Sequence, residues 1–185
     1  KLYKNDWIKL TKMIKIISKF PLFIDDTFNL SIQDIKSKIK TILFEQNQLG
    51  LVIIDYIQLM QTTNFENENR VQELSKITRS LKKIAREFNI PIIGLSQLSR
   101  NVENRVDKKP ILSDLRESGS IEQDADLVIM LYKNKVENSF ASQPIAKTSK
   151  SIELIIAKHR NGPTGTVQLK FHEEQTKFFN KETNF

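Results

Sequence analysis

The sequence contains no cysteine, and this absence excludes disulfide bonds, cysteine zinc sites and thiol catalysis. Only two histidines are present, His159 and His172, and their separation is not that of a metal-ligand pair. No apolar run approaches the length of a membrane span, and the N-terminus lacks the apolar core of a signal peptide. The chain begins with Lys1 rather than Met, so we expect it to be a piece of a longer protein.

The residues that are present are typical of one globular domain. The chain has 185 residues, of which 39% are hydrophobic and 28% charged, enough to build a core. The formal net charge of +7 favours acidic partners such as nucleic acid or nucleotide phosphates. Frequent Lys, Asn and Ile are equally typical of an AT-rich genome, so charge alone does not decide the partner.

The most informative stretch is LVIIDYIQ, residues 51–58. A β-branched apolar run predicts a strand buried on both faces, and Asp55 then follows it where open α/β sheets bind ligands. The alternative is that Asp55 only caps the next turn. A helix over 71–88 and a second buried strand over 92–95 follow, with Ser96 and Gln97 at its end. Strand, helix and strand in this order predict a parallel sheet that brings Asp55 and Gln97 side by side on one rim.

The other segments are assigned from periodicity and turn residues. Two further amphipathic helices are predicted over 7–19 and 31–44, the second with a capping box of Ser31 and Asp34. A short strand is expected over 22–24, and a fourth helix is expected to start at Ser120, with Gln123 completing a capping box. Buried strands are expected over 125–132 and 152–157, and hairpin strands over 166–171 and 178–179. Polar connections are expected over 61–69, 99–119 and 133–150, the last of them mobile.

Four stretches together resemble the C-terminal motor domain of the bacterial replicative DNA helicase (DnaB-type). They are LVIIDYIQLM, IPIIGLSQLSR, LSDLRESGSIEQDADLVIMLY and IIAKHRNGPTGTVQL, in the family's order. The resemblance covers nearly the whole chain, and DLRESGSIEQDAD is its most specific part, because core packing does not explain so long a polar run. It implies an α/β fold with a RecA-like, mostly parallel sheet flanked by helices and a C-terminal β-hairpin.

The resemblance implies a role for each matched residue. Asp55 corresponds to the Walker B acid, which would hold the water shell of Mg²⁺ on ATP. Gln97 resembles the glutamine that senses the terminal phosphate. The loop that lines the central pore of the hexamer and follows single-stranded DNA is matched by Arg116, Glu117 and Gly119.

Two cations at the end of a predicted strand complete the matched set. Lys158 and Arg160 correspond to the pair that reaches into the neighbouring subunit's ATP site, with Arg160 as the arginine finger. Read without the resemblance, they could equally be a solvated strand end. His159 stands between them where the family has glutamine.

The sequence departs from the family in one respect. It contains no phosphate loop of the form GxxxxGK[ST], whose backbone N–H groups and lysine hold the phosphates. The catalytic glutamate of the family's next strand is not found either. We therefore expect residues 1–185 to be a partial RecA-like domain that lacks its N-terminal part, begins after the Walker A region and folds poorly alone. The missing strand would lie next to the strand of Gln97.

Three functions remain open at this stage. The first is a homo-hexameric, ATP- and Mg²⁺-dependent replicative helicase that works on single-stranded DNA with a primase and a loader and without a membrane. Its location would be the plastid stroma or the bacterial cytoplasm. The second is a non-hydrolysing remnant or split half that binds DNA or joins a helicase ring. The third is a RecA-like recombinase, which the LRESGSIEQDAD segment disfavours.

Overall fold

The computed structural model describes residues 3–61, 69–115, 119–133 and 149–180. The helices are α1 (Lys4–Ile17), α2 (Ile32–Gln46), α3 (Arg70–Phe88) and α4 (Gly119–Asp124). The strands are β1 (Val52–Ile54), β2 (Ile92–Gly94), β3 (Leu127–Lys133), β4 (Ser149–His159), β5 (Gly165–His172) and β6 (Lys177–Asn180). Three 3₁₀ helices, η1 (Ile57–Leu59), η2 (Arg100–Asn104) and η3 (Leu112–Asp114), lie in the connections.

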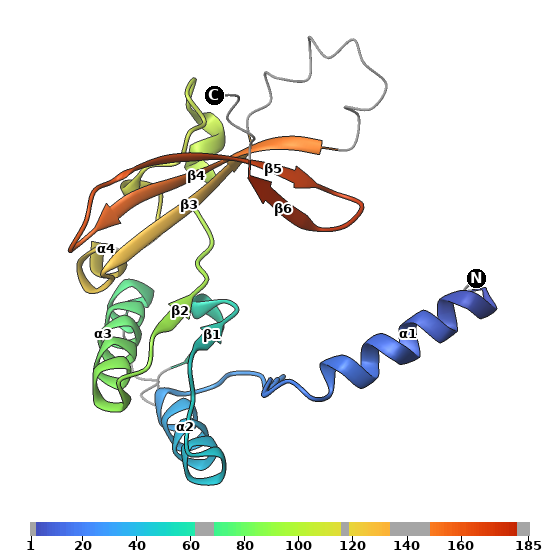
Figure 1. Ribbon diagram of the computed structural model, residues 1–185. Coiled ribbons are helices and arrows are strands. Elements are labelled where there is room, and N and C mark those ends of the chain that lie inside the picture. Colours follow the sequence, from blue (N-terminus) through green and yellow to red (C-terminus); the bar gives the residue numbers. More distant parts are fainter. Residues whose placement is uncertain (1–2, 62–68, 116–118, 134–148, 181–185) are drawn as a thin grey trace, which may run out of the picture.

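The strands form two separate sheets (Figure 1). β1 and β2 pair in parallel, with Ile54 opposite Gly94, and α3 connects them. β3, β4, β5 and β6 form an antiparallel sheet in that order, in which β4, β5 and β6 extend the predicted hairpin. The α/β class is confirmed, with the parallel part confined to β1 and β2 in the described chain.

α3 supplies more buried core residues than any other described element. Its apolar residues recur at helical spacing, and Leu74 and Ile77 have no exposed surface. Asn69 caps the N-terminus by accepting a hydrogen bond from the Val71 N–H at 3.3 Å, and Asn89 ends the helix in the left-handed conformation, φ 53°. The predicted helix is therefore confirmed, one residue longer at its N-terminus.

α2 also forms as predicted, from its capping box onward. Asp34 N–H donates to Ser31 Oγ at 3.2 Å, and Ser31 N–H donates to the Asp34 carboxylate at 3.0 Å. Ile35 and Ile39 are buried on its inner face, and Asn47 caps the other end with φ 59°. α2 thereby joins the same core as α3.

Two local predictions are wrong. Residues 22–24 form no strand, because no described strand offers them a backbone ladder, and Ile24 is 85% exposed. Ser120 is not a helix N-cap, because α4 already includes Gly119. Within the predicted polar connection 99–119, residues 99–115 are more ordered than their composition indicates, since they contain η2 and η3. Of the connection 133–150, predicted to be mobile, residues 134–148 lie outside the described residues, while Lys133 ends β3 and residues 149–150 begin β4. Residues 62–68 also lie outside the described residues.

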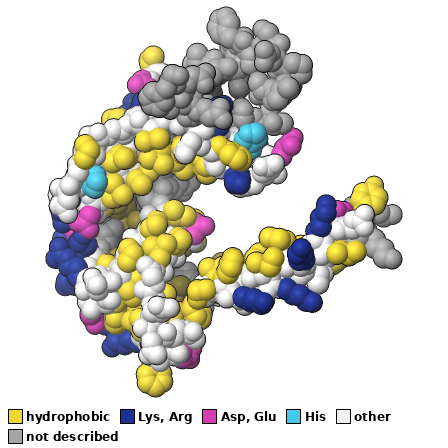
Figure 2. Space-filling view, viewed as in Figure 1, with side chains coloured by type: hydrophobic (Ala, Val, Ile, Leu, Met, Phe, Trp, Pro, Cys, Tyr) yellow, Lys and Arg dark blue, Asp and Glu magenta, His cyan; other side chains and the backbone are white. Residues whose placement is uncertain are grey.

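The two sheets leave apolar faces uncovered within the described residues. Val52 and Ile54 of β1 are half-buried, but Ile53, which points the other way, is 60% exposed. β3 alternates likewise, with Val128 and Met130 buried and Leu127, Ile129 and Leu131 exposed. The prediction of strands buried on both faces is thus wrong here. Figure 2 shows hydrophobic side chains lining the hollow between the antiparallel sheet and the layer that contains β1.

α1 projects from this body with its apolar residues exposed (Figures 1 and 2). The helix forms with the predicted amphipathic pattern, although it spans residues 4–17 rather than 7–19. Trp7, Leu10, Ile14 and Ile17, which share the predicted apolar face, are each at least 42% exposed. No described helix is long and apolar enough to span a membrane.

We predict that residues 1–185 alone do not unfold in a single cooperative transition as a monomer. Exposed apolar faces of this kind favour association. Differential scanning calorimetry with sedimentation velocity tests the prediction. Replacement of Ile129 and Leu131 by Thr, which keeps strand propensity, should reduce association. A sharp monomeric transition of the unchanged chain would contradict the prediction.

Candidate functional site

The first group of candidate residues lies at the carboxyl ends of β1 and β2. Asp55 directly follows β1 and Gln97 follows β2, and the parallel register places these two strand ends side by side. Both side chains are exposed. The backbone therefore sets Asp55 and Gln97 on one rim, as the strand order predicted, while their chemical roles remain predictions.

Gln58 ties the two strand ends together. Its Nε2 donates to Ser96 Oγ at 2.9 Å and lies 3.4 Å from the Gln97 carbonyl oxygen. Its Oε1 faces the Gln97 N–H at 3.5 Å. Backbone bonds add to this link, since Leu95 N–H donates to the Ile54 carbonyl at 2.9 Å. One amide side chain therefore fixes the backbone from which Gln97 projects, a role that the sequence alone did not reveal.

Gly94 allows η1 to cross the end of β2. A Cβ at this position would lie 2.8 Å from Ile57 Cγ2, closer than side-chain atoms pack. Ile57 itself is buried. The glycine is thus required by close packing that brings η1, and Gln58 within it, against the Gln97 strand.

The Asp55 carboxylate is an exposed group at the end of its strand. A single exposed carboxylate is the kind of group on which Mg²⁺ is held through water, because this ion keeps most of its hydration shell. The described residues contain no cluster of three or more His, Cys, Asp or Glu that could ligate a metal directly. The donor set therefore fits a water-mediated Mg²⁺ shared with phosphates and does not fit an all-protein metal site.

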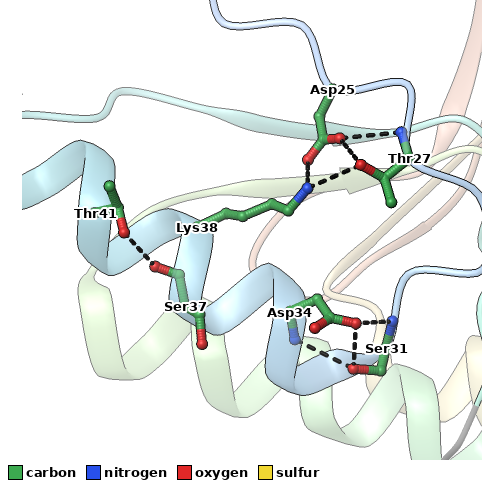
Figure 3. A network of polar contacts seen from close by, with 7 residues as sticks. All are labelled: Asp25, Thr27, Ser31, Asp34, Ser37, Lys38 and Thr41. Carbon is green, nitrogen blue, oxygen red and sulfur yellow. Dashed lines mark hydrogen bonds and ion pairs between the residues drawn. The ribbon is translucent and has the colours of Figure 1, made fainter.

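Asp25, Thr27 and Lys38 form a polar network (Figure 3), and these three residues line the same cavity as Asp55. Asp25 accepts hydrogen bonds from the Lys38 ammonium and from the Thr27 hydroxyl, the latter at 2.6 Å. These contacts, the Lys38 bond first, lower the pKa of Asp25 from 3.8 to about 2. The network joins segment 21–30 to α2 and forms one wall of a cavity of about 430 Å³, which Asp55 also lines.

We predict that Lys38→Gln raises the pKa of Asp25 towards its ordinary value of 3.8. A depressed carboxyl pKa contributes stability above 3.8, and that stability is lost as the pH falls towards about 2. Titration of the Asp ¹³C carboxyl resonances measures the shift. Lys40→Gln, an exposed lysine on the same helix, should leave the Asp25 pKa unchanged. An unchanged Asp25 pKa in Lys38→Gln would contradict the assigned ion pair.

The strand end at Gln97 is also joined to the base of the predicted DNA loop. Leu98 and Leu115 form an antiparallel bridge, and Ser99 N–H donates to the Asp114 carbonyl at 2.8 Å. The Asp114 side chain is buried, pairs with Arg105 and accepts from the Ile111 N–H at 2.8 Å. This pair, whose carboxylate is buried and which sequence reasoning missed, organises the segment up to residue 115.

The predicted DNA-binding residues are only partly described. Arg116 and Glu117 lie outside the described residues. Gly119 begins α4 and is exposed, and a Cβ there would contact nothing within 4 Å. Gly119 is therefore not required by packing in the described chain.

The second group, Lys158 and Arg160, lies at the end of β4 against α4. The Lys158 ammonium donates to the Glu122 carbonyl, and the Arg160 guanidinium donates to the Gln123 carbonyl at 3.3 Å. Arg160 also pairs with Asp126, with 3.0 Å between Nη1 and Oδ1. The partners of this group come from α4 and from Asp126, which precedes β3, whereas those of the first group come from β1, β2 and η1. The structure therefore brings the predicted site residues together as two groups.

The turn after Arg160 is shaped by His159. Its Nδ1 lies 3.3 Å from the Pro163 carbonyl oxygen, and a Cβ on Gly162 would lie 2.3 Å from His159 Cε1. Only glycine fits at position 162 while the ring keeps this place. Gly162 thus leaves room for His159, the residue that stands where the family has glutamine.

Comparison with known protein families gives one match over almost the whole chain. The family described as DnaB-like helicase C terminal domain matches residues 1–180. A probable replicative DNA helicase of Trieres chinensis is 65% identical over 96% of this chain and 39% of its own length. The replicative DNA helicase DnaB of Geobacillus stearothermophilus is 49% identical over 100% of this chain and 39% of its own length.

Solved structures agree with these relatives. A structure of a DnaB-like replicative helicase and its interactions with primase matches with a TM-score of 0.83 and 42% identity, over 98% of this chain and 43% of that chain. A second solved structure, described as an ATPase domain, matches with a TM-score of 0.82 and 42% identity, covering 98% of this chain and 62% of that chain. The chain thus spans about two fifths of the length of its curated relatives.

Proposed function

Because the chain belongs to the DnaB-like helicase C-terminal domain family, we propose that it is part of an ATP-dependent replicative DNA helicase. In this proposal the protein forms a homo-hexamer that hydrolyses ATP at its subunit interfaces and moves along single-stranded DNA to separate the duplex at the replication fork. The observation that carries the proposal is the register of β1 and β2, which sets Asp55 beside Gln97 at the ligand-binding edge of a parallel sheet.

The rim residues would act on the nucleotide. Asp55 would hold the water shell of Mg²⁺, which supplies charge neutralisation on the ATP phosphates when it is bound. Gln97, whose amide can both donate and accept hydrogen bonds, would contact the terminal phosphate. Gln58 supports this assignment, since it fixes the Gln97 backbone from two sides.

The cations at the end of β4 would act on the nucleotide of the neighbouring subunit. Arg160 is exposed at its strand end and would stabilise charge on the transferring phosphoryl group, with Lys158 beside it. Arg116, Glu117 and Gly119 would bind the backbone of single-stranded DNA. The link from Gln97 through the Leu98–Leu115 bridge to the base of that loop supports coupling between nucleotide and DNA.

Partners and location are inferred from the relatives. One solved relative is described with primase, so we include a primase among the partners, with a loader as a further expectation. Similarity to helicases of bacteria and of Trieres chinensis supports a location in the bacterial cytoplasm or the plastid stroma.

We predict that Arg160→Ala lowers the kcat of DNA-stimulated ATP hydrolysis by the intact protein by about 10³-fold or more, since an arginine finger supplies that order of stabilisation. Asp55→Asn should likewise abolish hydrolysis, because Mg²⁺ loses its carboxylate anchor. Steady-state phosphate release with single-stranded DNA measures both effects. Arg79→Ala and Glu45→Gln, exposed positions on α3 and α2, are the matched controls and should retain activity.

Mixing the two inactive variants tests whether the site is shared between subunits. In randomly mixed rings, about a quarter of the interfaces would combine an intact Asp55 with an intact Arg160, so activity should partly return. Full activity of Arg160→Ala, or no recovery from mixed rings of confirmed composition, would contradict the shared site.

A second function would follow only if the gene begins at Lys1, because residues 1–185 contain no GxxxxGK[ST]. A non-hydrolysing remnant or split half would join a helicase ring or bind DNA without turnover. The coding sequence before Lys1 separates the two functions, because the active helicase requires a phosphate loop there or in a partner gene.

A further inference from the structure

Asp126 contacts Arg160 through both its side chain and its backbone. Its Oδ1 lies 3.0 Å from Arg160 Nη1, and its carbonyl oxygen accepts the Arg160 N–H at 2.8 Å. Asp126 sits immediately before β3, whose first residue Leu127 pairs with His159 of β4. The side-chain contact therefore adds to a backbone bond that already fixes where Arg160 leaves the sheet.

The end of α4 provides a second support for the same guanidinium. Arg160 Nη2 donates to the Gln123 carbonyl at 3.3 Å, and Lys158 Nζ approaches the carbonyls of Glu122 and Gln123. Carbonyls in the last turn of a helix lack intrahelical partners and attract cations. Figure 1 shows α4 at the end of the sheet where β3 begins and β4 ends.

α4 is itself anchored, so these acceptors do not move independently. Thr78 of α3 donates from Oγ1 to Asp124 Oδ2 at 2.7 Å, and Thr78 is buried. Lys82 of the same helix pairs with Asp126. These cations, Lys82 first and Arg160 after it, hold the pKa of the Asp126 carboxyl below its ordinary value, so the group stays ionised near neutral pH.

We propose that Asp126 is a positioning residue for the Arg160 finger, holding one edge of the guanidinium while the remaining N–H groups face the neighbouring subunit's nucleotide. The inference rests on the function proposed above. A guanidinium has five N–H donors in a rigid plane, so a carboxylate on one edge and a carbonyl beside it fix the orientation of the others. Loss of the carboxylate leaves the cation in place but frees its rotation.

The experiment compares Asp126→Asn with Lys82→Gln in the intact protein. Asp126→Asn removes the charge and keeps the backbone bond to Arg160. Lys82→Gln removes the other partner of Asp126 and leaves the contact with Arg160. The readouts are kcat and KM for ATP in DNA-stimulated hydrolysis, with ring assembly measured for each variant. Arg160→Ala and the double variant Asp126→Asn/Arg160→Ala complete a cycle, with residual rates taken from single-turnover experiments.

We expect Asp126→Asn to lower kcat about five-fold, the size of effect given by one partly exposed ion pair, with KM for ATP unchanged within about two-fold. Lys82→Gln should keep kcat near that of the unchanged protein. In the double variant, Asp126→Asn should not lower kcat further, because the Arg160 guanidinium that Asp126 orients has already been removed. Asp126→Glu, which keeps the carboxylate, should recover part of kcat and serves as the test if the Asn variant does not assemble.

Several results would overturn the assignment. Equal loss of kcat in Lys82→Gln and Asp126→Asn would mean that Asp126 only anchors α3. An unchanged kcat in Asp126→Asn would mean that the contact between Asp126 and Arg160 does not contribute to hydrolysis. A raised kcat would mean that Asp126 restrains Arg160 instead of orienting it. If Arg160→Ala retains full activity, the proposed function fails as well. If Arg160→Ala is inactive while Asp126→Asn is normal, only the present inference fails.

Discussion

The in-register pairing of β1 with β2 is the interaction on which the candidate nucleotide site depends. It places the ends of two strands side by side, and Gln58 then joins the two connections that follow them. Gly94 is required because η1 packs directly over it. From the Gln97 strand end, the Leu98–Leu115 bridge leads to the base of the predicted DNA loop. One short pair of strands thus organises both the candidate nucleotide rim and the start of the predicted DNA-binding segment.

Both sheets leave strand edges and apolar faces uncovered in the described chain. In the described chain β2 pairs only with β1, and β3 pairs only with β4. A strand edge without a partner leaves backbone groups unpaired, and neither open edge pairs with another described strand. Ile53 of β1 and Ile129 and Leu131 of β3 also expose apolar surface. A further strand that paired with both β2 and β3 would provide backbone partners for both open edges. The family resemblance places the strand of the phosphate loop next to the strand of Gln97, which is β2.

Local sequence signals predicted the elements well where the signal was itself local. The period of α3, the capping box of Ser31 and Asp34, and the strand-helix-strand order each depend on neighbouring residues, and the structure has them. The strand predicted over 22–24 and the burial of both faces of β1 and β3 depend on residues that are distant in sequence, and these predictions were wrong. The pairs of Asp126 with Arg160 and of Asp114 with Arg105 escaped detection because ordinary charged residues meet only after folding.

The most direct test is the structure of the intact protein with a non-hydrolysable ATP analogue, Mg²⁺ and single-stranded DNA. The proposed motor predicts a ring in which a strand lies between β2 and β3, Asp55 faces the hydrated metal and Arg160 reaches the phosphates of the neighbouring subunit. A nucleotide bound away from Asp55 and Gln97, or an interface that leaves Arg160 far from any phosphate, would contradict it.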